Sequence, residues 1–192
     1  MMISPERLVA RHSSTVATLW RMTSLVLTLV GDDRAGLVAE VAEVVANHDG
    51  NWERSELAEL SGTFAGIVEV SVAADRADEL RAALEVLEGL LTITVHERAS
   101  APVDPSPAHR LVFRVLGNDH PGIVREISSA LRTYGVNIDR LTTQTRDAAM
   151  SGGRLFEATV VARLPASIDP EDVSIAIERL AAEIQVDVTL ED

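Results

Sequence analysis

An internal repeat constrains the fold of this chain more than any other feature of its sequence. Residues 25–52 read LVLTLVGDDRAGLVAEVAEVVANHDGNW, and residues 111–138 read LVFRVLGNDHPGIVREISSALRTYGVNI, at a constant offset of 86. Eight of these 28 positions are identical without gaps, and three of the identical pairs are Asp33 with Asp119, Gly36 with Gly122, and Asn51 with Asn137. A fixed period of this kind indicates that one structural unit occurs twice.

Both copies predict the element order strand, helix, strand, strand, helix, strand. Alternating apolar residues predict the first strand at 25–30, and apolar residues at helical spacing, including Val38, predict a helix after Gly36. In the second copy the expected apolar face of this helix includes Val124 and Tyr134. The second helix is expected to begin at Asp75 in the first copy and at Asp169-Pro170 in the second. The other expected strands are 51–60, 64–73 and 91–95 in the first copy, and 111–116, 137–146, 154–163 and 186–190 in the second.

This element order predicts an α+β fold of two ferredoxin-like βαββαβ domains, in which two helices cover one face of each antiparallel sheet. Prolines at 102, 105 and 107 predict an extended linker over residues 98–108. The expected domains are therefore residues 24–97 and 109–192, with residues 1–23 as an N-terminal extension. We expect the return strands to match as Val68 with Phe156, Val70 with Ala158, Val72 with Val160, and Glu69 with Glu157 on the opposite face.

Charge and composition narrow the classes of function. The formal net charge of -13 disfavours direct binding to nucleic acid, because an acidic surface repels the phosphate backbone. The sequence contains no cysteine, which excludes disulfides and thiolate metal sites and fits a reducing compartment. No apolar run is long enough to span a membrane. We therefore expect a cytoplasmic protein with no cofactor, no metal site and no membrane association.

A glycine-containing turn precedes the first helix of each copy and is the first candidate ligand site. The turn reads GDDRAG at residues 31–36 and GNDHPG at residues 117–122. Glycine lets another molecule approach the backbone, and the free N–H groups at a helix start suit a carboxylate. Asp33 and Asp119 could accept hydrogen bonds from a ligand ammonium. The alternative is an ordinary helix start that the aspartate caps.

Asn51 and Asn137 open the strand that follows the first helix of each copy and are the second candidate. An amide group offers both a donor and an acceptor, so it can contact either charged end of an amino acid. The alternative is an asparagine that completes the turn at the end of a helix. The sequence leaves both interpretations open.

The segments DRAGLVAEVAEVVANHDGNW and DHPGIVREISSALRTYGVNI resemble the first half of an ACT domain. The Asp-x-Pro-Gly opening and the Gly-Val-Asn-Ile ending are usual marks of that family. The resemblance extends over about residues 24–97 and 109–191. Two such domains without an enzyme domain, and the segment GTFAGIVEVSV in the first copy, resemble the glycine cleavage system transcriptional repressor family in particular.

The resemblance implies binding of a small molecule, commonly an amino acid such as glycine, between paired domains. The family's site combines the turn before the first helix of one domain with the start of the second strand of its neighbour. Because the first copy departs from the family pattern at Arg34-Ala35 and at Trp52, we expect the second copy to be the better site. Matched by residue, the implied ligand-binding residues are Asp33, Arg34, Ala35, Gly36, Asn51, Asp119, His120, Pro121, Gly122 and Asn137.

Two other classes of function fit the sequence less well. An enzyme is disfavoured because the five histidines are scattered without metal-ligand spacing, and His120 is better explained as a turn residue. Tetrahydrofolate deformylases also begin with an ACT-like segment, so a folate or one-carbon enzyme relative with residual catalysis is the alternative, although it would need a further catalytic domain. An RNA-binding module of this fold needs exposed aromatic residues and a basic face, whereas Thr28, Glu69 and Glu157 point outward here.

The sequence therefore predicts a non-catalytic regulator that senses a small ligand and modulates a partner protein, with a transcription factor as a candidate partner. Because helices cover only one face of each sheet, apolar residues on the other face favour pairing between copies or between chains. These residues are Val26, Val30, Val112 and Leu116. We accordingly expect a homodimer.

Overall fold

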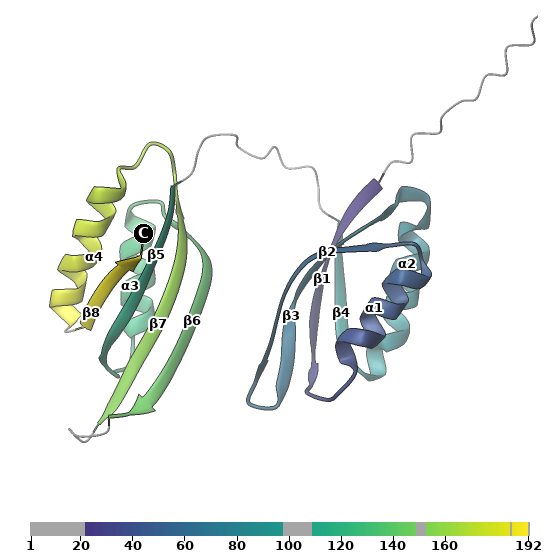
Figure 1. Ribbon diagram of the computed structural model, residues 1–192, viewed down its shortest axis with the longest axis horizontal. Coiled ribbons are helices and arrows are strands. Elements are labelled where there is room, and N and C mark those ends of the chain that lie inside the picture. Colours follow the sequence, from purple (N-terminus) through teal and green to yellow (C-terminus); the bar gives the residue numbers. More distant parts are fainter. Residues whose placement is uncertain (1–21, 98–108, 149–152, 185, 192) are drawn as a thin grey trace, which may run out of the picture. The chain divides into compact units, whose positions relative to one another are not determined.

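The computed structural model describes residues 22–97, 109–148, 153–184 and 186–191 (Figure 1). The chain divides into two compact units between Pro102 and Val103. The predicted linker, residues 98–108, lies outside the described residues. The predicted N-terminal extension, residues 1–23, also lies outside them, apart from Met22 and Thr23, which belong to the first strand.

The first unit is a four-stranded antiparallel sheet with helices on one face (Figure 1). Its strand order is β2-β3-β1-β4, so β1 and β3 pair at the centre and β2 and β4 form the edges. The elements are β1 (Met22–Asp32), α1 (Leu37–Asn47), β2 (Asn51–Leu60), β3 (Thr63–Ala73), η1 (Ala74–Arg76), α2 (Ala77–Glu85), η2 (Val86–Gly89) and β4 (Thr92–Glu97).

The second unit repeats this arrangement, with the strand order β6-β7-β5-β8. The predicted fold, two βαββαβ units with helices on one face of each sheet, is confirmed (Figure 1). In the part of the chain that the structure describes, no helix is long and apolar enough to cross a membrane. The elements are β5 (His109–Asn118), α3 (Ile123–Thr133), β6 (Asn137–Asp147), β7 (Arg154–Leu164), α4 (Pro170–Ile184) and β8 (Val186–Glu191).

Each unit has its own apolar core between its sheet and its helices. The alternating residues Leu25, Leu27 and Leu29 of β1 are buried, as the period-2 pattern predicts. Phe113, the repeat equivalent of Leu27, is fully buried in the second core. The predicted alternation of the first strands is therefore confirmed in both units.

Three residues that the helical spacing assigned to buried stripes are exposed instead. The buried line of α1 runs through Leu37, Val41 and Val45, one residue in four. The residue after Leu37 lies about 100° further around the helix and faces solvent. The exposed residues are Val38 (43%), Val124 (39%) and Tyr134 (36%).

The second helices begin differently in the two units. Asp169 caps α4 as predicted, because its Oδ1 accepts a hydrogen bond from the Glu171 N–H at 2.9 Å. In the first unit α2 begins at Ala77 rather than at Asp75, because the chain first forms the 3₁₀ turn Ala74–Arg76. No proline presets the first helical turn there, whereas Pro170 does so in α4.

The match between the return strands β3 and β7 differs from the expectation by four residues. Gly31 pairs with Phe64, and its repeat equivalent Gly117 pairs with Phe156, so Phe64 rather than Val68 corresponds to Phe156. The cause is the hairpin length, since pairing closes at Leu60–Thr63 in one unit and at Asp147–Arg154 in the other. A shift by an even number of residues leaves every side chain on its predicted face. Glu69 and Glu157 thus lie on equivalent faces of their two sheets but at different positions along the strands.

Candidate ligand-binding site

The turn between β1 and α1 and its counterpart between β5 and α3 have the same backbone geometry. Gly36 and Gly122 directly precede the two helices, with φ angles of 98° and 99°. Residues other than glycine are strained in this left-handed region. The backbone therefore requires glycine at both positions, whether or not a ligand binds there.

The aspartates of the two turns do not cap the helices. The N–H of Asp33 donates to the Gly62 carbonyl at 2.9 Å, and the N–H of Asp119 donates to the Arg154 carbonyl at 2.8 Å. Both aspartates are exposed, and among the residues that the structure describes no side chain caps α1 or α3 at its start. The capping alternative is wrong, and the N–H groups of the first helical turn stay available to an anion.

The second turn carries a cation that the first lacks at the equivalent helix position. Arg125 lies in the first turn of α3, and its Nη2 is 3.6 Å from Oε1 of Glu126. The same Nη2 would lie 3.2 Å from a Cβ atom at Gly122, whereas the residue equivalent to Arg125 in α1 is Ala39. Nδ1 of His120 lies 3.3 Å from the Pro121 carbonyl oxygen, which fits its interpretation as a turn residue.

The remaining residues of the two turns are arranged in the same way. Arg34 and Ala35 in the first turn are exposed, as is Pro121 in the second. Val38 and Val124, one residue into each helix, are exposed apolar side chains beside the turn. Each turn therefore offers backbone donors next to an apolar side chain on an accessible surface.

Each asparagine lies at the far end of its unit from the turn. Asn51 pairs with Ser71, near the start of β1, whereas Asp32 pairs with Thr63 at the other end of the sheet. The 11 residues of α1 span about 16 Å between these ends. One unit therefore does not bring the turn and the asparagine to the same small ligand, and the second unit has the same geometry.

In the first unit the asparagine belongs to a polar cluster on the edge strand. Nδ2 of Asn51 donates to Oε1 of Glu53 at 2.9 Å, and the hydroxyl of Ser71 donates to the same oxygen. The hydrogen bond from Ser71, and after it that from Asn51, lowers the pKa of the Glu53 carboxyl below its ordinary value. Glu53 is therefore a fixed, ionised acceptor beside Asn51.

The second unit has the same cluster, with an arginine in place of the serine; the contact of Arg163 with Asp139 is called the clamp below. Nδ2 of Asn137 donates to Oδ1 of Asp139 at 2.8 Å. Arg163, which pairs with Asn137 across the strands, donates from Nη2 and Nε to both carboxylate oxygens of Asp139 at 2.9–3.1 Å. A bidentate contact of this kind holds the carboxylate more rigidly than a single hydroxyl does.

The two acids and their partners were not among the residues singled out in the sequence. The signal was present, because Asn51-Trp52-Glu53 and Asn137-Ile138-Asp139 repeat the pattern Asn-x-acid at the offset of 86. The partners Ser71 and Arg163 could not be found, since they are equivalent only in the strand register of the folded units.

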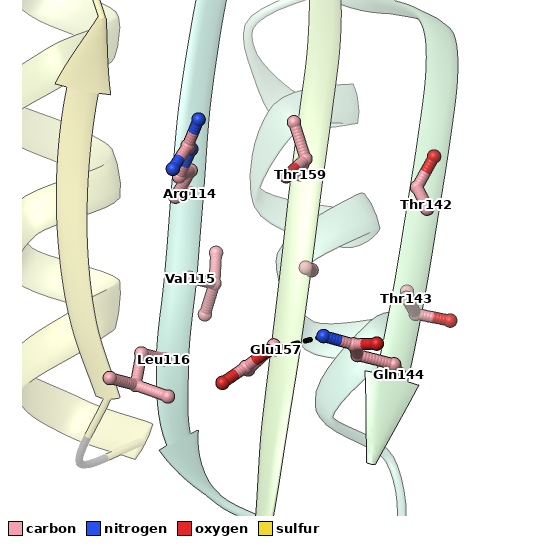
Figure 2. Close-up of a pocket in the computed structure, with 9 residues that line it drawn as sticks. Arg114, Val115, Leu116, Thr142, Thr143, Gln144, Glu157 and Thr159 are labelled. Carbon is pink, nitrogen blue, oxygen red and sulfur yellow. Dashed lines mark hydrogen bonds between the residues drawn. The ribbon is translucent and has the colours of Figure 1, made fainter. Parts of the chain in front are cut away.

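The faces that the helices leave uncovered carry a shallow hollow in each unit. The hollow of the second unit has a volume of about 440 Å³, and Arg114, Thr142, Thr159, Gln144 and Glu157 extend into it from three strands (Figure 2). The hollow of the first unit, about 230 Å³, lies over Val26, Ile67 and Glu69. The uncovered face of the second unit is thus the more polar of the two.

Two hydrogen bonds hold the carboxylate of Glu157 in the second hollow. Nε of Arg146 and Nε2 of Gln144 donate to its two carboxylate oxygens. The hydrogen bond from Arg146, followed by that from Gln144, lowers the pKa of Glu157 below its ordinary value. In the described segments no three His, Asp or Glu side chains are grouped so that they could hold a metal ion.

Comparisons with known proteins agree with this architecture. A family model described as an ACT domain matches residues 23–97. Over 170 residues the chain is 27% identical to the glycine cleavage system transcriptional repressor of Escherichia coli (strain K12), a match that spans 87% of this chain and 88% of the relative.

Two solved structures extend the likeness to both units. An unknown protein from Galdieria sulphuraria matches with a TM-score of 0.80 and 32% identity, over 89% of this chain and 98% of the other. A candidate glycine cleavage system transcriptional repressor matches with a TM-score of 0.65 and 17% identity, over 88% and 96% of the two chains. At that identity the second likeness shows the fold alone.

Proposed function

We propose that this chain, a tandem ACT-domain protein, is a non-catalytic regulator that senses an amino acid such as glycine. It resembles a relative whose name describes a transcriptional repressor, over 87% of its length. The observation that carries the proposal is the geometry present in both units: an exposed helix start that no described side chain caps, and an exposed asparagine held at the opposite end.

The two candidate groups suit the two charged ends of an amino acid. The N–H groups at the start of α1 or α3 attract a carboxylate, while the asparagine and its neighbouring acid attract an ammonium. Because these groups lie at opposite ends of a unit, the site forms where the turn of one ACT domain meets the asparagine of a neighbouring one. Arg125 and the Arg163–Asp139 clamp favour the second unit's groups over those of the first.

The output of the sensor is contact with a protein, a transcription factor being the candidate partner. The net charge of -13 disfavours contact with DNA itself, so a ligand must act by favouring the pairing geometry that a protein partner recognises. Such a partner would place the chain in the cytoplasm. A salt-sensitive shift of promoter DNA by the purified protein alone would contradict this part of the proposal.

We also propose that two chains associate through the uncovered face of the first unit. Val30 and Ile67 are each 50% exposed on that face, and Ala65 and Ala58 lie beside Val30 on the two neighbouring strands. Arg54 and Glu69, an ion pair at 3.3 Å, border the apolar residues and supply both signs of charge. A face that carries a positive and a negative charge at its border can complement a second copy of itself, because each charge can then meet its opposite.

A thermal-shift screen of the full chain against the common amino acids tests the sensor. A ligand at a hundred times its dissociation constant should stabilise the protein by about 2.7 kcal/mol, which raises the melting temperature measurably. Asn137→Ala should weaken the response more than the matched variant Asn51→Ala, because the second unit has the stronger clamp. A chain whose melting temperature responds to no amino acid would rule out the proposed function.

A further inference from the structure

A β-bulge places an acid beside the asparagine at the same point in both units. The register of β2 against β3 shifts between Trp52 and Arg54, and that of β6 against β7 shifts between Ile138 and Arg140. The residues left without a pairing partner are Glu53 and Asp139. Each side chain contacts the asparagine two residues before it and the residue paired with that asparagine.

This contact determines which end of the asparagine amide faces outward. A carboxylate only accepts hydrogen bonds, so the NH₂ group of Asn137 must face Asp139, and the assignment of the amide oxygen and nitrogen follows. Oδ1 of Asn137 is then directed away from the acid, and no donor within the described segments reaches it. The exposed end of the amide is thus an acceptor.

We propose that Asp139, and in the first unit Glu53, are positioning residues that fix the asparagine with its oxygen toward the ligand, so that this end of the site selects a primary ammonium. The inference rests on the proposed function and names the recognition chemistry of one half of its site. An ammonium donates to Oδ1, whereas a carboxylate placed there meets a second acceptor. Because Arg163 balances the charge of Asp139, the amide oxygen rather than a net charge makes this selection. The N–H groups at the helix start then bind the carboxylate of the ligand.

The chain offers its own matched controls for this role. The first unit has Glu53 in this place, so Asp139→Glu should preserve the orientation of Asn137. Asp139→Asn keeps the side-chain shape but replaces a group that can only accept with one that can also donate, so the orientation of Asn137 is no longer fixed. Both variants alter an exposed residue outside the apolar core. The comparison therefore separates the loss of the carboxylate from any general disturbance of β6.

The first measurement is independent of any ligand. The two side-chain N–H protons of Asn137 in the full chain should give well-separated NMR signals, because one of them donates to Asp139 and the other does not. Asp139→Glu should preserve this separation, and Asp139→Asn should reduce it. A separation that is the same in Asp139→Asn as in the wild type would overturn the positioning role, even if an amino acid binds.

The second measurement is calorimetry with glycine and with acetate, which lacks only the amino group. Asp139→Asn should weaken glycine binding about tenfold, the scale of one charge-assisted hydrogen bond, and change acetate binding by less than about twofold. Asp139→Glu should stay close to the wild type for both probes. An unchanged ratio of glycine to acetate affinity in Asp139→Asn would overturn the selection. If the Asn137 signals depend on the carboxylate of Asp139 but no amino acid binds the wild type, the proposed function fails and the selection with it.

Discussion

The helix-covered faces of the two sheets are apolar at matching positions, whereas the uncovered faces differ at the two levels nearest the turn, a level being one row of paired residues across the strands. Next to the turn, the first unit presents Val30, Ala65 and Ala58 across β1, β3 and β2. The second unit presents Leu116, Glu157 and Gln144 at that level. One level further along, Thr28, Ile67 and Glu56 in the first unit correspond to Arg114, Thr159 and Thr142 in the second.

The difference shows which parts of the repeat the fold constrains. Packing between sheet and helices tolerates only apolar exchanges, such as Leu27 against Phe113, because both side chains are fully buried. The uncovered face has no such restriction, so the first unit has Ala65 and Ile67 at the levels where the second has Glu157 and Thr159 in a polar hollow. Experiments that exchange residues between equivalent levels can test this division.

The largest effect should come from Gly66→Ala, at a level where the second unit already has Ala158. A Cβ at Gly66 would lie 2.1 Å from the Glu56 carbonyl oxygen and 2.8 Å from Leu57 Cα, both of which are backbone atoms. We expect a loss of about 3 kcal/mol in the free energy of unfolding, because the strands must move apart. The exchange in the other direction, Ala158→Gly, should cost only about 1 kcal/mol.

Urea denaturation of both variants checks this expectation. The small cost of Ala158→Gly reflects one lost methyl group and a more flexible chain, with no clash. Equal losses in the two variants would show that the strands of both units are spaced alike, and that Gly66 has no special role.

A smaller effect is expected when a charge is placed on each uncovered face. Ile67→Glu should weaken association between chains by about 2 kcal/mol, or roughly thirtyfold in the dissociation constant, because it puts a charge into the apolar surface. Thr159→Glu, its counterpart at the same level, should leave association unchanged. Sedimentation over a range of concentrations measures both constants, and dissociation by Thr159→Glu as well would mean that both faces take part.

The sequence predicted the fold because its signals are local and occur twice. The alternation in β1 and the repeated glycine turn fixed element order and buried faces, and neither depends on distant contacts. The register of β7 depends on the number of residues between Asp147 and Arg154, where the sequence carries no periodic signal. The predicted match between the two return strands therefore slipped by four residues while keeping the correct face.

The candidate site was predicted less completely, for a physical reason. Gly36 and Asn51 could be identified, since each is repeated at a fixed offset. The left-handed φ of Gly36, which gives the glycine a structural role, is not visible in a sequence that also fits a capped helix. The clamp of Asp139 by Arg163 joins residues 24 positions apart and exists only once the strands pair around the bulge.

The smallest effect concerns the two turn glycines, where the units should behave alike. Gly36→Ala and Gly122→Ala should each cost about 1 kcal/mol of stability, because alanine must adopt φ angles of 98° and 99°. A Cβ at Gly36 meets nothing within 4 Å, and one at Gly122 meets only side-chain ends, Nη2 of Arg125 at 3.2 Å and Oε1 of Glu126 at 3.5 Å. Strain rather than crowding should therefore set both costs.

Asparagine separates these two causes, because it tolerates the left-handed region better than alanine although its side chain is larger. If φ sets the cost, Gly36→Asn and Gly122→Asn should be less destabilising in thermal denaturation than the alanine variants. The reverse order in the second unit alone would indicate that Arg125 crowds the turn. Amino acid binding, measured on the same variants, reports on the ligand separately. If the ligand approaches the backbone at Gly122, the folded Gly122→Asn variant should bind it more weakly than the wild type does.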